Sequence, residues 1–204
     1  DIKFRNTNGF ETDTLGNLIL DINGNPYERV TTNDRTIIGK PNPDFYFGFD
    51  NSFTYKNWGL SFFFQGIYGN DILSLTRREI ERMDHYFNYS ALTLDRWRAP
   101  GQITNVPRAI VGDPNDNNRT STRWFEDGSF IRLKYLTIGY RLPGNILSKL
   151  MISSAQVYLT AENILTFTNY SLYDPEVATN GSSGIDMGGV PQSRNFLIGI
   201  RIGF

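Results

Sequence analysis

Residues 194–204 read R-N-F-L-I-G-I-R-I-G-F and end the 204-residue chain. Apolar residues alternate there with small or polar ones, which places Phe196, Ile198, Ile200, Ile202 and Phe204 on one face of a strand. Strands of bacterial outer-membrane barrels alternate in this way, with the apolar face toward lipid and the other face toward the lumen. Ends of soluble chains usually fray into water, so an aromatic at the last position favours a membrane barrel. We expect Gly199, Ile202 and Phe204 to act as the signal for barrel assembly.

The composition agrees with this interpretation. The chain has 15 Phe, 11 Tyr and 3 Trp, and barrels place such residues toward lipid and at the membrane interfaces. No stretch approaches the roughly 20 apolar residues of a membrane helix. A mean hydropathy of -0.37 does not argue against a barrel, because half of each barrel strand is polar. The absence of cysteine excludes disulfides and cysteine-based metal sites, and a net charge of -1 gives no reason to expect nucleic acid.

Five segments have the period-two pattern of strands: residues 45–55, 60–68, 130–142, 152–165 and 194–204. The connections between them alternate in length, with long ones at about 69–129 and 166–193. Outer-membrane barrels have short periplasmic turns and long extracellular loops. We therefore predict an all-β fold, with residues 1–44 as an extracellular loop region and residues 45–204 as C-terminal transmembrane strands.

Five strands cannot close a barrel. Single-chain bacterial barrels have an even number of strands, at least eight, and each unpaired backbone group in lipid costs several kcal/mol. We therefore expect the C-terminal piece of a larger antiparallel barrel, in preference to an assembly of several copies. The chain begins at Asp1 without Met or a signal peptide, so we also expect further polypeptide upstream.

A calcium loop is the first alternative for the N-terminal region. The D-I-N-G-N stretch at residues 21–25 is similar to the start of an EF-hand, but Pro26 follows it and Thr32 stands where the twelfth-position Glu is required. We interpret it as an Asn-Gly turn, in preference to a calcium site, and expect no cofactor.

Enzyme motifs are missing from the sequence. No G-x-S-x-G, P-loop or G-x-G-x-x-G pattern occurs, and His85 is the only histidine, which excludes two-histidine zinc motifs. A hydrolase in the outer membrane would have to use His85 with a Ser or Asp. The charged run at residues 77–82 predicts a short helix with a solvated face. We expect neither an enzyme nor a metal site.

The loop at 166–193 carries the candidate substrate-binding residues. Tyr170, Tyr173, Asp174 and Asn180 combine aromatic rings with carboxylate and amide groups. Such groups stack on and hydrogen-bond a sugar or a peptide, and binding residues are often on loops. The alternative is an ordinary polar surface loop.

Read in order, several stretches resemble the C-terminal part of the SusC/RagA family of TonB-dependent outer-membrane transporters from Bacteroidetes. They are D-I-K-F at 1–4, N-D-R-T-I-I-G-K-P-N-P-D-F at 33–45, F-F-Q-G-I-Y-G-N-D-I at 63–72, R-W at 96–97, V-P-R-A at 106–109, S-T-R-W-F-E-D-G-S-F-I-R-L-K-Y-L-T-I-G-Y at 121–140, A-E-N-I-L-T-F-T-N-Y-S-L-Y-D-P-E-V at 161–177, P-Q-S-R-N-F at 191–196 and the terminal Phe204. The chain departs from the family in an insertion that reaches Pro26, where members often have an acidic D-x-N-G-D-G-like run.

The resemblance implies a barrel of 22 strands in the outer membrane with an N-terminal plug, driven by TonB and capped by a SusD-like surface lipoprotein. Such transporters import oligosaccharides or peptides. This chain would supply the last five strands and their extracellular loops, while the plug and the TonB-contacting segment would lie upstream of Asp1. The alternative is a barrel-borne adhesin or structural surface protein without transport. A plug with a TonB-contacting motif would favour import, and its absence would favour the adhesin.

Overall fold

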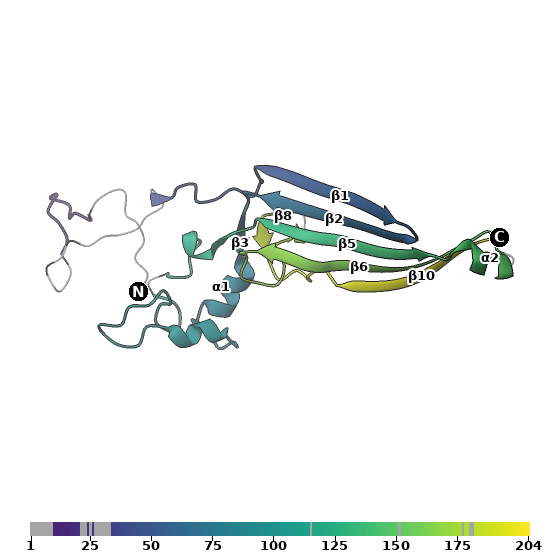
Figure 1. Cartoon of the computed structure of the whole chain (residues 1–204). Coiled ribbons are helices and arrows are strands. Elements are labelled where there is room, and N and C mark those ends of the chain that lie inside the picture. Colours follow the sequence, from purple (N-terminus) through teal and green to yellow (C-terminus); the bar gives the residue numbers. More distant parts are fainter. Residues whose placement is uncertain are drawn as a thin grey trace. The chain divides into compact units, whose positions relative to one another are not determined.

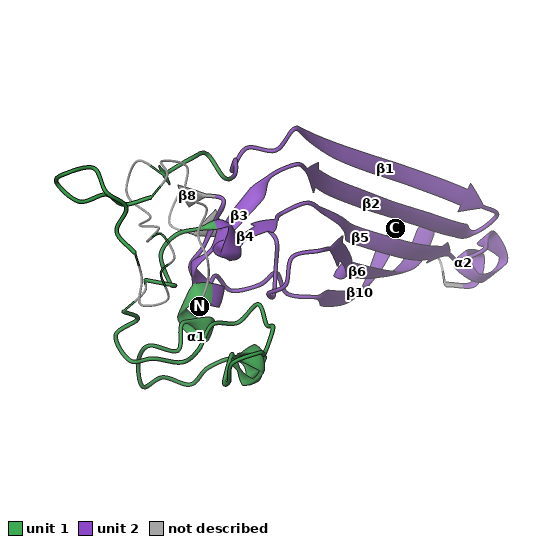
Figure 2. Ribbon diagram, turned by 90° about the vertical axis from the view of Figure 1, so that its left-hand side faces the viewer, with its two compact units in different colours: residues 1–38, 78–121 green, residues 39–77, 122–204 purple. Residues whose placement is uncertain are grey.

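The structure is a computed structural model that describes residues 10–20, 24, 26, 34–114, 116–150, 152–176, 178–179 and 182–204. The chain divides into two compact units (Figure 2). The first consists of residues 1–38 and 78–121, and the second of residues 39–77 and 122–204. All five long strands belong to the second unit.

The five long strands form one antiparallel sheet (Figure 1). They are β1 (Phe45–Tyr55), β2 (Trp58–Tyr68), β5 (Phe130–Arg141), β6 (Ser154–Thr168) and β10 (Asn195–Gly203). Their spatial order is β1-β2-β5-β6-β10, so neighbours in sequence are neighbours in the sheet. Within the described part of the chain, no further strand pairs with the outer edges of β1 and β10. The predicted all-β fold with five antiparallel strands is confirmed.

The register of the sheet separates an apolar face from a polar one. One row across all five strands contains Phe53, Leu60, Ile138, Leu159 and Ile198, each paired with the next. All but Leu60 are exposed in the chain, and Ile198 is 80% exposed. An exposed apolar surface five strands wide is unfavourable in water, because apolar area costs about 25 cal/mol per Å². This face is therefore the one suited to lipid.

The next row of the sheet faces the other way and is polar. Ser52, Ser61, Thr137 and Thr160 are paired in succession across β1, β2, β5 and β6. The hydroxyl oxygens of Thr137 and Thr160 are 2.8 Å apart. A hydroxyl both donates and accepts hydrogen bonds, so side chains of this kind suit a surface that is in contact with water. The alternation predicted from the sequence is thus present in the paired strands.

Aromatic rings gather at both ends of the apolar face. Trp58 and Tyr140 lie beside the short β1–β2 turn, with ring centroids 4.8 Å apart. At the opposite end Phe45 stacks on Tyr68 at 5.2 Å. Membrane barrels carry such aromatic bands at the two interfaces between lipid and water.

An irregularity in β5 changes which residues face each side. The β5–β6 register shifts between Leu133 and Tyr135, and Asn163 on β6 has a φ of 53°. After the bulge, odd-numbered residues of β5 such as Tyr135 and Thr137 lie on the polar face. Before the bulge, the even-numbered Arg132 lies on that face. A bulge re-aims side chains in this manner. It places Arg132 and Lys134 on the polar face although they interrupt the alternation in sequence.

Short elements complete the two units. Two 3-10 helices are η2 (Ala91–Asp95) and η3 (Thr122–Trp124), and the α-helices are α1 (Leu75–Glu81) and α2 (Gly144–Leu150). A small sheet has the order β4-β3-β9, from β4 (Phe125–Asp127), β3 (Asp71–Ser74) and β9 (Ile185–Asp186), and a further pair joins β7 (Ala178–Thr179) to β8 (Ser182–Ser183). Among the described residues, no helix has the length and apolar character needed to span a membrane.

The predicted charged helix is confirmed as α1, but the prediction that its charged residues are all solvated is wrong in part. Glu81 is 3% exposed and Asp84, just beyond the helix, is 5% exposed. Arg82 donates to Asp84, so ion pairing accompanies the burial of Asp84. The D-I-N-G-N stretch lies outside the described residues except for Gly24.

Candidate functional site

A buried cluster of charges joins the polar face of the sheet to the loop between β6 and β10. Arg132 on β5 is 3% exposed. Its guanidinium donates to Asp174 at 2.5 Å, to Glu176 at 2.8 Å and to the hydroxyl of Thr166 at 2.9 Å. Lys134 donates to both oxygens of Glu176, at 2.8 and 3.1 Å. Two cations of the strand are thus matched by two anions of the loop, which is how proteins tolerate buried charge.

Asp174 is also held by the backbone of its own loop. Its carboxylate accepts the N–H groups of Glu176 at 2.9 Å and of Gln192 at 2.8 Å. Burial alone raises the pKa of this carboxyl, but the hydrogen bonds from Arg132 and from the two backbone groups outweigh it, so the pKa lies below its usual value. An ionised Asp174 therefore fastens two distant points of the loop to β5.

Tyr170 forms a second anchor of the same loop. The residue is 5% exposed, and its hydroxyl donates to a carboxylate oxygen of Asp186 and lies 3.3 Å from the hydroxyl of Ser74. The other oxygen of Asp186 accepts the hydroxyl of Thr76 at 3.0 Å and the N–H of Gly188 at 2.8 Å. Burial and the hydrogen bond to Asp186 raise the pKa of Tyr170 well above its ordinary value. The phenol therefore stays a donor at physiological pH.

A third contact ties the loop to β4. Glu126 accepts the N–H of Ser171 at 2.8 Å and its hydroxyl at 2.9 Å. Arg77 donates to the same carboxylate at 3.1 Å. The loop after β6 is therefore held by β5, by β4 and by the residues around β3.

The remaining polar face offers groups for transient hydrogen bonding. Tyr135 donates to Asp50 at 2.9 Å and stacks on Phe63 with ring centroids 5.8 Å apart. Asn195 donates to Glu162 at 3.0 Å. Aromatic rings beside carboxylates and hydroxyls can stack on and hydrogen-bond a polar ligand. Within the described part of the chain, no three acidic or histidine residues are placed to hold a metal ion.

The structure places the predicted substrate-binding residues in different surroundings. Tyr170 and Asp174 are buried within the two anchors, whereas Tyr173 is 85% exposed. Asn180 lies outside the described residues. A role for these four residues in substrate binding stays a prediction.

Sequence reasoning did not identify Arg132 and Lys134 as candidate residues. The available signal was a pair of cations that breaks the alternation of an otherwise apolar strand. Buried cations require anionic partners, and the acidic loop supplies them.

Known proteins similar to this chain are TonB-dependent receptors. Receptors P3, P26 and P39 of Formosa agariphila are 36%, 34% and 30% identical to it over 95%, 86% and 93% of the chain. The chain spans about one fifth of the length of these relatives, 18% to 19%. No protein-family model matches the chain.

Solved structures show the same arrangement. The RagAB peptide importer in its closed-closed state matches 91% of this chain with a TM-score of 0.75 and 27% identity. The open-open state matches 92% with a TM-score of 0.73 and 26% identity. Each match covers 20% of the solved chain. By sequence and by fold, the chain belongs to the TonB-dependent outer-membrane receptors and forms a segment of their β-barrel.

Proposed function

We propose that this segment is part of the wall of an outer-membrane importer that carries peptides or glycans inward. The relatives are described as receptors and as a peptide importer rather than as enzymes. The segment's own task would be binding and passage of the cargo. TonB would supply the energy through a plug encoded upstream.

The two-faced register of the sheet carries this proposal. The row from Phe53 to Ile198 presents apolar side chains to one side, while the row from Ser52 to Thr160 presents hydroxyls to the other. A wall between lipid and a watery lumen requires that arrangement. The open edges of β1 and β10 would pair with strands from the rest of the barrel. Lipid offers no hydrogen-bond partners, so the backbone N–H and C=O groups at these edges need partners from protein.

The connections give the proposed orientation. The short turn at Lys56 and Asn57 and the connection that contains α2 would face the periplasm. Residues 1–44, 69–129 and 166–193 would lie on the extracellular side, where they meet the cargo. A SusD-like surface lipoprotein would be the partner that covers these loops.

Uptake measurements test the proposal. The gene for the full-length receptor is deleted in its native bacterium and restored in trans, and uptake of fluorescent oligopeptides and oligosaccharides is followed. Uptake that needs both the receptor and TonB, and that a protonophore abolishes, supports import. Surface attachment that persists without TonB, with no uptake, would instead support the adhesin.

A further inference from the structure

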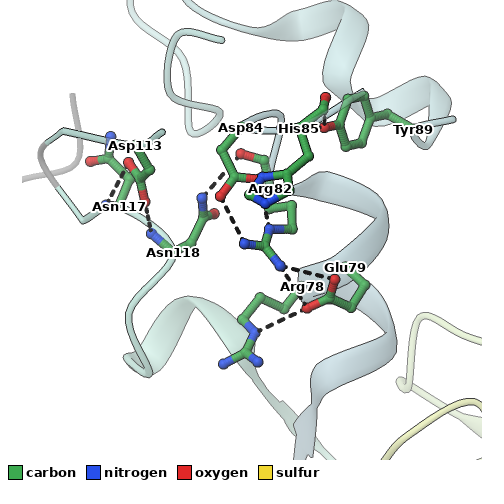
Figure 3. A network of polar contacts seen from close by, with 9 residues as sticks. All are labelled: Arg78, Glu79, Arg82, Asp84, His85, Tyr89, Asp113, Asn117 and Asn118. Atoms are coloured by element: carbon green, nitrogen blue, oxygen red, sulfur yellow. Dashed lines mark hydrogen bonds and ion pairs between the residues drawn. The ribbon is translucent and has the colours of Figure 1, made fainter. Parts of the chain in front are cut away.

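A polar pocket lies within the first unit, apart from the charge cluster on β5. Its volume is about 510 Å³, and the residues around it include three arginines, Arg78, Arg82 and Arg119. Figure 3 shows the first two of these with their polar contacts. Acidic residues also contribute, among them Asp84 and Asp113. The chemistry of the pocket depends on which of these charges are already paired.

Arg82 is paired with two carboxylates. It donates to both oxygens of Asp84 at 2.6 and 2.9 Å and to both oxygens of Glu79 at 3.1 and 3.0 Å. His85 adds its Nδ1 atom at 3.0 Å from Asp84. Burial raises the pKa of Asp84, but the hydrogen bond from Arg82 outweighs it and the pKa lies below the usual value. Asp84 therefore stays ionised and neutralises Arg82.

The other acids of the pocket also have donors. Asp113 accepts the backbone N–H groups of Asn117 at 2.9 Å and Asn118 at 2.8 Å. Asp116 forms an ion pair with Arg119 at 3.1 Å. These carboxylates hold the loop together and are not free to bind a cation.

Arg78 is the exception among the charged groups. Its Nε atom lies 3.8 Å from Glu79, beyond hydrogen-bond distance, and both oxygens of Glu79 are taken by Arg82. In the described residues no group accepts from its two terminal nitrogens, and in Figure 3 the contact drawn to Arg78 starts at Nε. The side chain is only 29% exposed. A partly desolvated guanidinium with an open fork is built to take a carboxylate through two parallel hydrogen bonds.

We infer that Arg78 binds a carboxylate of an imported peptide in this pocket. The inference rests on the proposed import function and names the kind of cargo. A peptide is favoured over a glycan because the similar solved structures are of a peptide importer. Arg82, Arg119 and their partners would hold the rim while Arg78 makes the contact.

A matched pair of probe peptides tests the inference. The full-length receptor with its lipoprotein partner is titrated with an octapeptide that contains two glutamates and with its glutamine counterpart, both amidated at the C-terminus. The glutamate peptide should bind more tightly. Arg78→Gln should weaken its binding by about tenfold and leave the glutamine peptide unchanged, since a hydrogen bond to a charged group contributes about 1.5 kcal/mol or more. Arg78→Lys should lose part of the affinity, because lysine lacks the fork.

Arg98→Gln is the control, because Arg98 is an exposed arginine of the same unit that does not line the pocket. Its binding of both peptides should match the wild type. Equal affinity of the wild type for the two peptides overturns the inference even if Arg78→Gln fails to assemble. An Arg78→Gln receptor that assembles poorly yet still prefers the glutamate peptide also overturns the inference. Arg78 would then serve to stabilise the protein by pairing within it, and would not bind the peptide.

Two outcomes separate this inference from the import function. Arg78-dependent binding of tetragalacturonate with no peptide binding overturns the assignment to peptides. Uptake that depends on TonB but ignores the charge of the cargo overturns the role of Arg78 and leaves import intact. Loss of import itself, with no uptake of any probe by the wild type, overturns both.

Discussion

The guanidinium of Arg132 lies 2.5 Å from the carboxylate of Asp174, and neither side chain is more than 10% exposed. The two residues are 42 positions apart, one on a strand of the sheet and one in the loop after β6. A buried ion pair of this kind contributes little net stability but is costly to break, because one charge then remains buried without a partner. The pair therefore fixes where the loop lies on the polar face.

Asp174→Asn should free the loop. The variant leaves Arg132 with Glu176 as its remaining anion, and the free energy of local opening should fall by about 3 kcal/mol. Hydrogen exchange of the full-length receptor, read by mass spectrometry over residues 169–176 and 190–194, measures this. Asp116→Asn is the control, since its carboxylate is 67% exposed and such pairs contribute less than about 1 kcal/mol. Unchanged protection of the loop in the Asp174 variant would contradict the anchoring role.

The same anchor should respond to acid. Because the pKa of Asp174 is lower in the folded loop than its unfolded value of 3.8, its contribution is complete above that value and is lost as the pH falls through the folded pKa. Cleavage of the loop by pepsin should therefore rise below about pH 4 in the wild type. In Asp174→Asn the loop should be cleaved at every pH where pepsin acts. A wild-type loop that resists cleavage down to pH 2 would contradict the assignment.

Tyr170→Phe should weaken the second anchor. The variant removes the donor to Asp186 and leaves that carboxylate with Thr76 and Gly188. A lost partner of a buried charged group costs about 1–3 kcal/mol, so hydrogen exchange near residue 186 should accelerate by tenfold or more. Tyr173→Phe, at an exposed tyrosine, should leave exchange unchanged. Equal exchange in both variants would show that the buried hydroxyl adds no stability.

Gly184→Ala should disrupt the pairing of β3 with β9. Gly184 has a φ of 73°, and an added Cβ would lie 2.6 Å from the Cβ of Pro41 and 3.1 Å from the carbonyl oxygen of Asp71. Its carbonyl accepts the N–H of Leu73 at 2.8 Å, so exchange of that amide reports the damage. Gly188→Ala is the control, because its φ is 85° but its nearest atom, in Thr76, is 3.7 Å away. Only the left-handed backbone penalty, about 1 kcal/mol, applies to the control, and equal effects would contradict the packing argument.

The long strands were predictable from the sequence because each one alternates over many residues. Residues 45–55 were assigned as they occur in β1, and the terminal strand within one residue at each end. β6 runs to Thr168, beyond the predicted end at residue 165, because the bulge around Asn163 interrupts the period. Strands β3, β4 and β9 have two to four residues, which is too few to show a period in the sequence. These residues are strands because they pair with one another in the folded chain.

The anchors could not be predicted by spacing. Arg132 and Asp174 are distant in sequence, and so are Tyr170 and Ser74, so their contacts follow from the folded chain alone. The composition of the loop did indicate polar and aromatic chemistry. It did not distinguish Asp174, which is buried in an ion pair, from Tyr173, which is exposed.

Spin labels on β10 test the central claim, that this sheet is a wall between lipid and lumen. These 204 residues contain no cysteine, and single cysteines are placed on β10 of a full-length receptor from which any other cysteines have been removed, in outer membranes. Labels at Ile198 and Ile200 should be relaxed by oxygen, which concentrates in lipid, and labels at Gly199 and Arg201 by a water-soluble nickel chelate. Oxygen and nickel accessibility that alternate along the strand are the predicted result. Nickel accessibility at all four positions would contradict the claim.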